Sequence, residues 1–139
     1  MKLRTMAGLV VLSLASLGTV SVMAHHAFDT EFDAKKPVTL TGVVTKVEWT
    51  NPHVWFYLNV KNEKSGEMEN WGFEMGGPNG LQREGWSRNT IKIGEVLTVE
   101  GFLARNGSRN VNSKNVIVKS TGQKLGAASS IGKTAPELP

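Results

Sequence analysis

Residues 38–50 read Val-Thr-Leu-Thr-Gly-Val-Val-Thr-Lys-Val-Glu-Trp-Thr, and the architecture of the chain follows from this run. Its β-branched residues favour an extended strand, and the Asn51-Pro52 dipeptide directly after it is a turn signal. Gly42 in the middle of the run indicates a bulge or a sharp bend. A long, bent first strand is expected in a small barrel, where one strand must serve both sides.

Four further strands are predicted after this one, over residues 53–61, 67–75, 96–104 and 110–120. Between the third and fourth strands, Asn79 is a possible N-cap for a short helix over Leu81–Trp86. We therefore predict an all-β fold, a small five-stranded OB-fold-like barrel with one short helix between strands 3 and 4. A small open β-sandwich is the alternative.

The first 24 residues have the three parts of a secretory signal. Lys2 and Arg4 give a basic start, a short apolar run follows, and Val22 and Ala24 supply the small residues that signal peptidase reads. The apolar run is too short and too rich in Ser, Gly and Thr to span a bilayer. We expect cleavage after Ala24, export to the periplasm, and no stable membrane insertion afterwards.

Four segments follow from this reading: a signal peptide (1–24), an N-terminal arm (25–37), the OB-like β-barrel domain (38–121) and a disordered tail (122–139). Removing 24 of the 139 residues leaves 115, which is enough for one domain. In the arm, Phe28 and Phe32 are expected to pin an extended segment to the domain. The tail is Gly-, Ala-, Ser- and Pro-rich and shows no periodicity.

Composition excludes several function classes. The formal net charge of +4 includes Lys2 and Arg4, so the mature chain keeps an excess of only two positive charges. That excess is too small for a nucleic-acid-binding face, and we expect no nucleic-acid partner. The chain has no cysteine, so disulfides, thiolate metal sites and cysteine nucleophiles are absent.

Four short motifs occur together in this chain. They are His25-His26-Ala27-Phe28, the TNPHVWF run at 50–56, the EMGGP loop at 74–78 and the GWSRN segment at 85–89. The combination resembles a family of short exported bacterial proteins classed as a domain of unknown function. The resemblance covers about residues 25–118 and implies a periplasmic location and a small β-domain, but no activity.

The three histidines are the leading metal-binding residues. Cleavage after Ala24 would make His25 the first residue, whose amine and Nδ1 can chelate one metal ion. His53 follows a rigid Asn-Pro turn and is the best third nitrogen, with His26 as its competitor. A three-nitrogen donor set suits Cu(II), so we predict copper. A solvated N-terminus and a turn histidine are the structural alternatives.

A second arrangement uses sulfur and aromatic rings. Along the second strand His53, Trp55 and Tyr57 share a face, and along the third strand Trp71, Phe73 and Met75 do. If the two faces coincide, the Met75 thioether and the indole rings could hold Cu(I) beside His53. The alternative is that the third-strand set is core.

The aromatic residues also permit a function without a metal. OB folds bind ligands across their second and third strands, and the aromatic residues in or beside these strands are Trp49, Trp55, Tyr57 and Trp71. We therefore weigh two functions. The first is a periplasmic metal-binding protein that binds, transfers or stores copper. The second is a non-catalytic binding module for a glycan or a partner protein. No triad or carboxylate pair is recognisable, which favours binding over catalysis.

Overall fold

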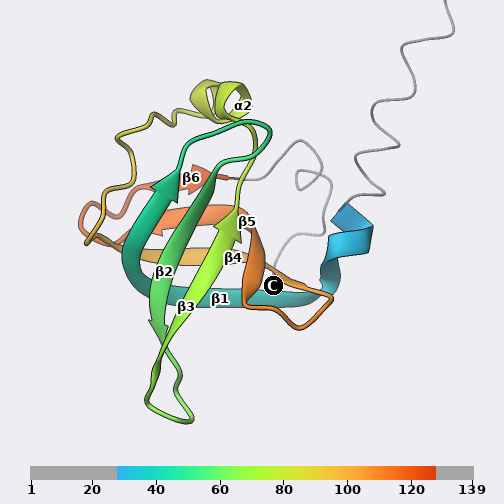
Figure 1. The fold of residues 1–139 in the computed structure, drawn as a ribbon. Coiled ribbons are helices and arrows are strands. Elements are labelled where there is room, and N and C mark those ends of the chain that lie inside the picture. Colours follow the sequence, from blue (N-terminus) through green and yellow to red (C-terminus); the bar gives the residue numbers. More distant parts are fainter. Residues whose placement is uncertain (1–27, 128–139) are drawn as a thin grey trace, which may run out of the picture.

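The structure is a computed structural model that describes residues 28–127 (Figure 1). Residues 28–31 are helical and lead directly into the first strand. The elements that follow are β1 (Phe32–Glu48), β2 (Trp55–Lys61), β3 (Met68–Glu74), α2 (Pro78–Arg83), β4 (Val96–Ala104), β5 (Asn110–Val118) and β6 (Lys124–Gly126).

The strands close into a barrel. Neighbours in the order β3-β2-β1-β4-β5-β6 are antiparallel, and an additional parallel pairing joins β3 to β5 through residues 72–74 and 110–112. The ring β1-β2-β3-β5-β4 therefore returns to β1, as the crossing strands in Figure 1 show. This order, with a helix between β3 and β4, is the OB-fold arrangement and confirms the predicted all-β barrel.

Gly42 lies where β1 is shared between two neighbours. It pairs with Val60 of β2 on one side and with Leu97 of β4 on the other. A Cβ at this position would lie 2.5 Å from the carbonyl oxygen of Asn59, so only glycine allows the close approach of the strands. The register of β1 shifts between Val44 and Lys46 against β2, and between Phe32 and Pro37 against β4. Of the two alternatives predicted for Gly42, a bulge or a sharp bend, the bulge is therefore not at this residue.

The first strand begins at Phe32, six residues before the predicted Val38. Phe32 pairs with Ala104 of β4, so part of the expected arm belongs to the sheet. The Phe28 ring lies 6.0 Å from the rings of both Phe32 and Phe102, and these residues form a second buried cluster. The two rings pin the segment as expected, but residues 28–31 are helical rather than extended.

Other elements also differ from the sequence prediction. The second strand begins at Trp55 rather than at residue 53, so His53 precedes the strand that it was expected to open. Helix α2 begins at Pro78 rather than Leu81, because proline is favoured in the first helical turn, and Gly77 is its N-cap instead of Asn79. A sixth strand, β6, lies in the segment expected as a disordered tail. It pairs with β5, and Trp86 Nε1 donates a 2.7 Å hydrogen bond to the Gly126 carbonyl oxygen.

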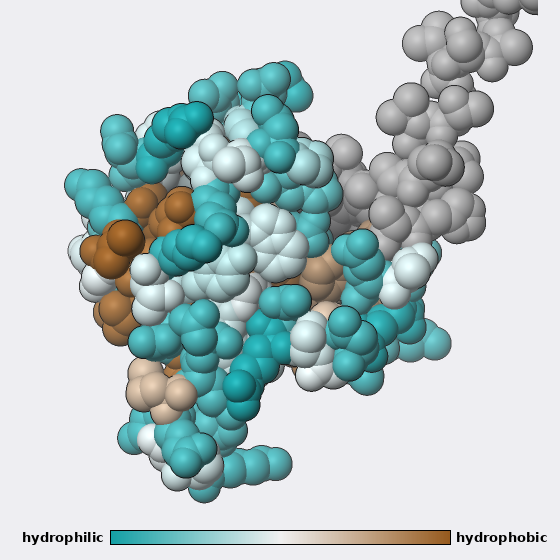
Figure 2. All heavy atoms as spheres, viewed as in Figure 1, coloured by the Kyte–Doolittle hydropathy of each residue, from teal (hydrophilic) through white to brown (hydrophobic). Residues whose placement is uncertain are grey.

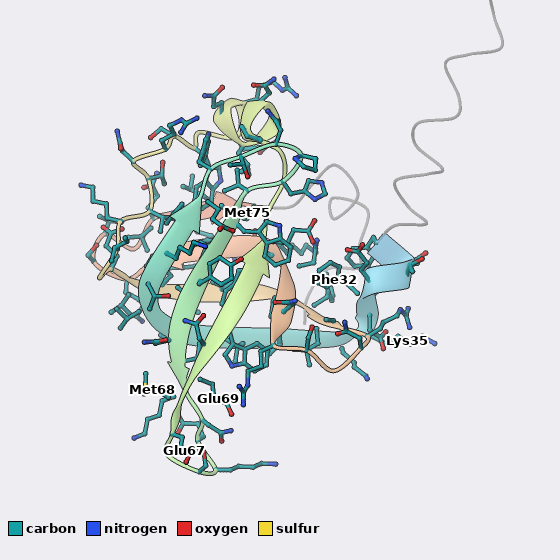
Figure 3. All side chains as sticks on the ribbon, in the orientation of Figure 1. Phe32, Lys35, Glu67, Met68, Glu69 and Met75 are labelled. Carbon is teal, nitrogen blue, oxygen red and sulfur yellow. The ribbon has the colours of Figure 1, made fainter. Side chains whose placement is uncertain are left out.

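The main core fills the barrel. Phe56 of β2 and Phe73 of β3 are fully buried and stack with ring centroids 5.1 Å apart. Figure 2 shows that the outer surface seen in this view is mostly hydrophilic, with hydrophobic atoms gathered at one side. The exposed large apolar residues of the described part are Val43, Met68, Ile93 and Val96. Figure 3 places Met68 near the β2–β3 hairpin, far from Met75 at the other end of β3.

Candidate functional site

The register of β2 and β3 decides which side chains share a face. Trp55 is paired with Glu74, and Phe56 with Phe73. Since paired residues of antiparallel strands point to the same side, Trp55 and Glu74 lie on the outer face, while Phe56 and Phe73 face the core. The outer face at the end of β3 is where the structure brings polar and aromatic groups together.

Two of the sequence motifs meet at this edge. The backbone of Val54 forms hydrogen bonds with both Met75 (2.8 Å) and Gly76 (3.0 Å), which fastens the TNPHVWF run to the EMGGP loop. The Asn51–Pro52 peptide bond is cis. A Cβ on Gly77 would lie 2.8 Å from the Pro52 carbonyl oxygen, so glycine is needed where the loop crosses the turn. This packing holds the backbone of His53 in place.

His53 and Glu74 form the central pair of the site. The imidazole Nδ1 of His53 and the carboxylate Oε1 of Glu74 are in direct contact as an ion pair or hydrogen bond. The side chain of Glu74 is only 7% exposed, whereas that of His53 is 34% exposed. The contact uses Nδ1, so the Nε2 atom of His53 is the nitrogen left for an external partner.

The pair raises the pKa of His53 above its ordinary value near 6.5. The main cause is the hydrogen bond to the Glu74 carboxylate; burial of the imidazole acts in the opposite direction, and the negative charges of Glu74 and Glu31 raise the pKa further. The influence of Glu31 indicates that the helical segment 28–31 lies near the imidazole. Two carboxylates, Glu31 before His53 in the sequence and Glu74 after it, therefore act on this histidine.

Two buried oxygen atoms beside this pair lack a hydrogen-bond partner within residues 28–127. They are Oε2 of Glu74 and Oδ1 of Asn112, and the two residues are direct partners across the β3–β5 pairing. A buried acceptor without a donor is costly. The site therefore has spare negative and acceptor character next to His53.

The predicted metal ligands are distributed unevenly. His25 and His26 lie outside the described residues. Met75 is fully buried in the main core and points away from the outer face that carries His53. The predicted combination of a thioether and an imidazole on one surface is therefore not formed, because the β2–β3 register puts the two sets on opposite sides.

The four aromatic residues predicted to form a ligand face lie on two different sides of the sheet. Trp55 and Tyr57 lie on the outer face, and the Tyr57 hydroxyl donates a 3.1 Å hydrogen bond to Glu48. Trp49 and Trp71 are partly buried and pack against the main core. Trp71 is paired with the buried Leu58, so it faces inward. The predicted platform of four rings is replaced by two.

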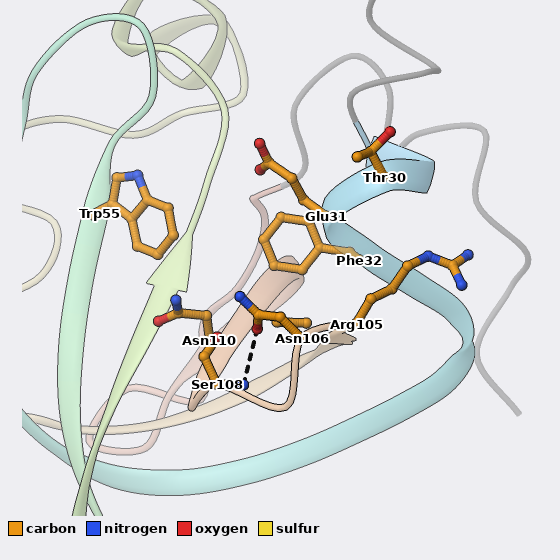
Figure 4. Close-up of a pocket in the computed structure, with 9 residues that line it drawn as sticks. Thr30, Glu31, Phe32, Trp55, Arg105, Asn106, Ser108 and Asn110 are labelled. Carbon is orange, nitrogen blue, oxygen red and sulfur yellow. Dashed lines mark hydrogen bonds between the residues drawn. The ribbon is translucent and has the colours of Figure 1, made fainter.

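A cavity of about 470 Å³ lies beside Trp55, the cross-strand partner of Glu74. Trp55 forms one side, and Glu31 and Phe32 form the opposite side, as Figure 4 shows. The floor comes from the turn after β4 and the start of β5, with Asn106 and Asn110. The remaining lining residues are Thr30, Ala104, Arg105 and Ser108.

Sequence reasoning missed Glu74 and the cavity residues. Glu74 alternates with the buried Phe73 and Met75, and this alternation indicates the outer face. Its neighbours on β2 could be identified only once the register of the two strands was known. Asn106 was interpreted only as part of a hairpin turn. The dense polar run Arg105–Asn110 was the signal available for a binding loop.

Within residues 28–127, no group of three or more His, Asp or Glu side chains could hold a metal ion by itself. No helix in that range is long and apolar enough to cross a membrane.

The comparisons with known proteins give a family and a fold neighbour. A family model described as "Family of unknown function (DUF6152)" matches residues 11–113. No curated protein matches the chain. A crystal structure of the mitochondrial single-stranded DNA binding protein Rim1 from S. cerevisiae is similar, with a TM-score of 0.47 and 8% identity. The match covers 60% of this chain and 93% of Rim1, a similarity too low to bear on the ligand of this chain.

Proposed function

The chain belongs to a family of unknown function, DUF6152, and because that membership assigns no chemistry, we propose from the site itself that the protein is a periplasmic metal-binding protein. In this proposal it binds Cu(II) through Nε2 of His53 together with the amine and Nδ1 of an N-terminal His25. Its role is the binding, transfer or storage of copper.

The observation that carries the proposal is the buried Glu74 carboxylate on Nδ1 of His53. Metal-binding histidines almost always donate their second ring N–H to a carboxylate, a carbonyl or a water molecule, which fixes the tautomer and raises the basicity of the other nitrogen. Glu74 stands in that relation to His53. The unpartnered Oε2 of Glu74 adds negative character that favours a cation nearby.

The N-terminal arm can reach His53 in this proposal. Phe28 is held in the second buried cluster, and Glu31, one helical turn later, acts electrostatically on His53. Three residue steps separate His25 from Phe28, which in an extended chain span roughly 10 Å. The proposal requires that this span bring the terminal amine released by cleavage after Ala24 to His53.

Copper is favoured over other divalent ions by the donor types. Two ring nitrogens and one amine form a nitrogen set that suits tetragonal Cu(II), which also leads the affinity order of the divalent ions. The buried position of Met75 removes the thioether that would have favoured Cu(I). Glu74 and Glu31 together supply negative charge that lowers the cost of bringing a divalent cation to His53.

The test is a Cu(II) titration followed by EPR. It compares four proteins: the chain that begins at His25, the same chain with one extra N-terminal glycine, His53→Ala, and His26→Ala as the matched control. We expect tight one-to-one binding with nitrogen hyperfine structure in the first and the last. The extra residue and the loss of His53 should each abolish the tight site.

Two results would overturn the proposal. Equal binding by the first two proteins would remove the terminal amine from the ligand set. Loss of the site in His26→Ala, with its retention in His53→Ala, would assign the third nitrogen to the arm and leave the Glu74–His53 pair as a structural contact.

A further inference from the structure

The cavity beside Trp55 has the dimensions and lining of a small-ligand site. Its volume of about 470 Å³ lies within the range of roughly 300–1,000 Å³ that ligand pockets occupy. Trp55 belongs to neither buried cluster and remains half-buried on the cavity wall. Phe32 and Ala104, which are buried members of the second cluster, give the opposite wall an apolar part.

Several polar groups around this cavity have hydrogen-bonding capacity left. Oδ1 of Asn106 accepts a 2.9 Å hydrogen bond from the Ser108 backbone N–H, which leaves its amide nitrogen as a donor. Within residues 28–127, no side-chain hydrogen bond engages the amide of Asn110 or the carboxylate of Glu31. Figure 4 shows these groups around the same space as the Trp55 ring.

The charges of the cavity disfavour an anionic ligand. Arg105 is the one cation among the described lining residues; it donates a 2.6 Å hydrogen bond to the Asp29 carbonyl oxygen and lies 3.9 Å from the Asp33 carboxylate. Arg105 is therefore already paired, and Glu31 adds a negative charge on the cavity wall. A phosphate, a carboxylate or a nucleic-acid backbone would meet repulsion without a free cation.

We propose that this cavity binds a neutral sugar that carries an acetamido group. The Trp55 ring would stack on the C–H face of the pyranose, as aromatic rings do with flat, partly apolar ligands. The amides of Asn106 and Asn110 both donate and accept, which matches hydroxyl and acetamido groups. The apolar part formed by Phe32 and Ala104 suits the acetamido methyl. All five residues lie in the described fold, and the inference does not rest on the metal proposal.

The experiment uses the ¹⁵N-labelled chain beginning at His25, kept metal-free with a chelator, and follows the indole N–H signals by NMR. The probe is N,N′-diacetylchitobiose, with cellobiose as the comparison sugar that lacks acetamido groups. The Trp55 signal is assigned from Trp55→Phe. We expect it to shift saturably with the acetylated sugar at up to about 10 mM, a range typical of weak small-ligand sites.

Three variants test the lining. Because Trp55→Ala removes the indole signal, binding to the variants is followed by the backbone amide signals of the cavity residues. Trp55→Ala should weaken binding by about tenfold or more, since a stacked tryptophan is commonly a dominant contact. Asn110→Ala should weaken it by about tenfold through the lost hydrogen bond. Trp71→Phe is the matched control, because Trp71 faces inward and does not line the cavity. The dispersion of the amide spectrum checks that each variant is folded.

Each other outcome overturns the inference. No saturable shift of the Trp55 signal with the acetylated sugar would remove the site, whether or not copper binds. An equal response to cellobiose would overturn the acetamido assignment. Saturable backbone amide shifts of unchanged affinity in both Trp55→Ala and Asn110→Ala, with each variant folded, would place the sugar elsewhere.

Discussion

Replacing Glu74 by Gln tests whether this carboxylate controls the histidine beside it. Gln keeps the size of the side chain but removes the negative charge on Nδ1 of His53. The largest cause of the raised pKa of His53 is lost, so that pKa should fall. An amide can also donate to Nδ1, which would move the ring proton to Nε2 and remove the lone pair available to a metal.

The magnitude follows from the position of Glu74 behind the histidine. Loss of such a partner commonly reduces metal affinity by about 10- to 100-fold, which corresponds to about 1.4–2.7 kcal/mol. We expect Glu74→Gln to be in this range because the carboxylate is only 7% exposed and little screened by water. Glu31→Gln is the matched control. Glu31 acts on His53 only through space, so its loss should lower the pKa less and leave the tautomer unchanged.

The assay has two independent readouts. A pH titration of the His53 ring signals in the metal-free protein gives the pKa and the tautomer, and a competition titration gives the Cu(II) affinity. An unchanged pKa and tautomer in Glu74→Gln would refute the role of Glu74, whatever happens to the metal. A changed tautomer with unchanged Cu(II) affinity would instead separate His53 from the metal site.

Three further predictions concern stability. The pKa of His53 is raised in the folded state, so its pair with Glu74 stabilises the fold fully below the ordinary pKa near 6.5 and loses that contribution as the pH rises through the raised pKa. The Tm difference between the protein and His53→Asn should therefore be larger at acidic than at alkaline pH. A Tm difference that grows with pH would contradict this. Phe56→Ala should lower the free energy of unfolding, measured in urea, by about 3–5 kcal/mol, because it removes one ring of the buried Phe56–Phe73 stack. A loss below about 1 kcal/mol would contradict the core position of Phe56. Gly77→Ala should lower Tm and broaden the His53 signals, because the new Cβ would displace the Pro52 carbonyl; an unchanged spectrum would show that the loop adapts freely.

Much of the fold could be predicted because its signals are local. The β-branched run at 38–50 and the alternating apolar residues of 53–61 identified strands whose inner residues are buried or partly buried. The boundaries were less accessible. The start of β1 at Phe32 and the sixth strand at Lys124–Gly126 depend on partners supplied by β4 and β5, which no local pattern reveals.

The candidate site was only partly predictable for the same reason. His53 was identified from its chain neighbours, the Asn-Pro turn before it and the strand after it. Glu74 is 21 positions further along the chain, and its contact with His53 arises from the β2–β3 register. That register also separated Met75 and Trp71 from the outer face, since a strand with one side buried commits each residue to one side.

The sequence by itself therefore determined that this chain forms a β-barrel, where its turns fall and that His53 follows the Asn51-Pro52 turn directly. Propensity, alternation and turn chemistry act between near neighbours, and so they can be recognised along the chain. Only the tertiary structure decided the partners: the closure of β3 on β5, the carboxylate behind His53 and the cavity between Trp55 and Phe32. These depend on which distant segments pair, a choice made by the summed packing of the whole barrel rather than by any one stretch of sequence.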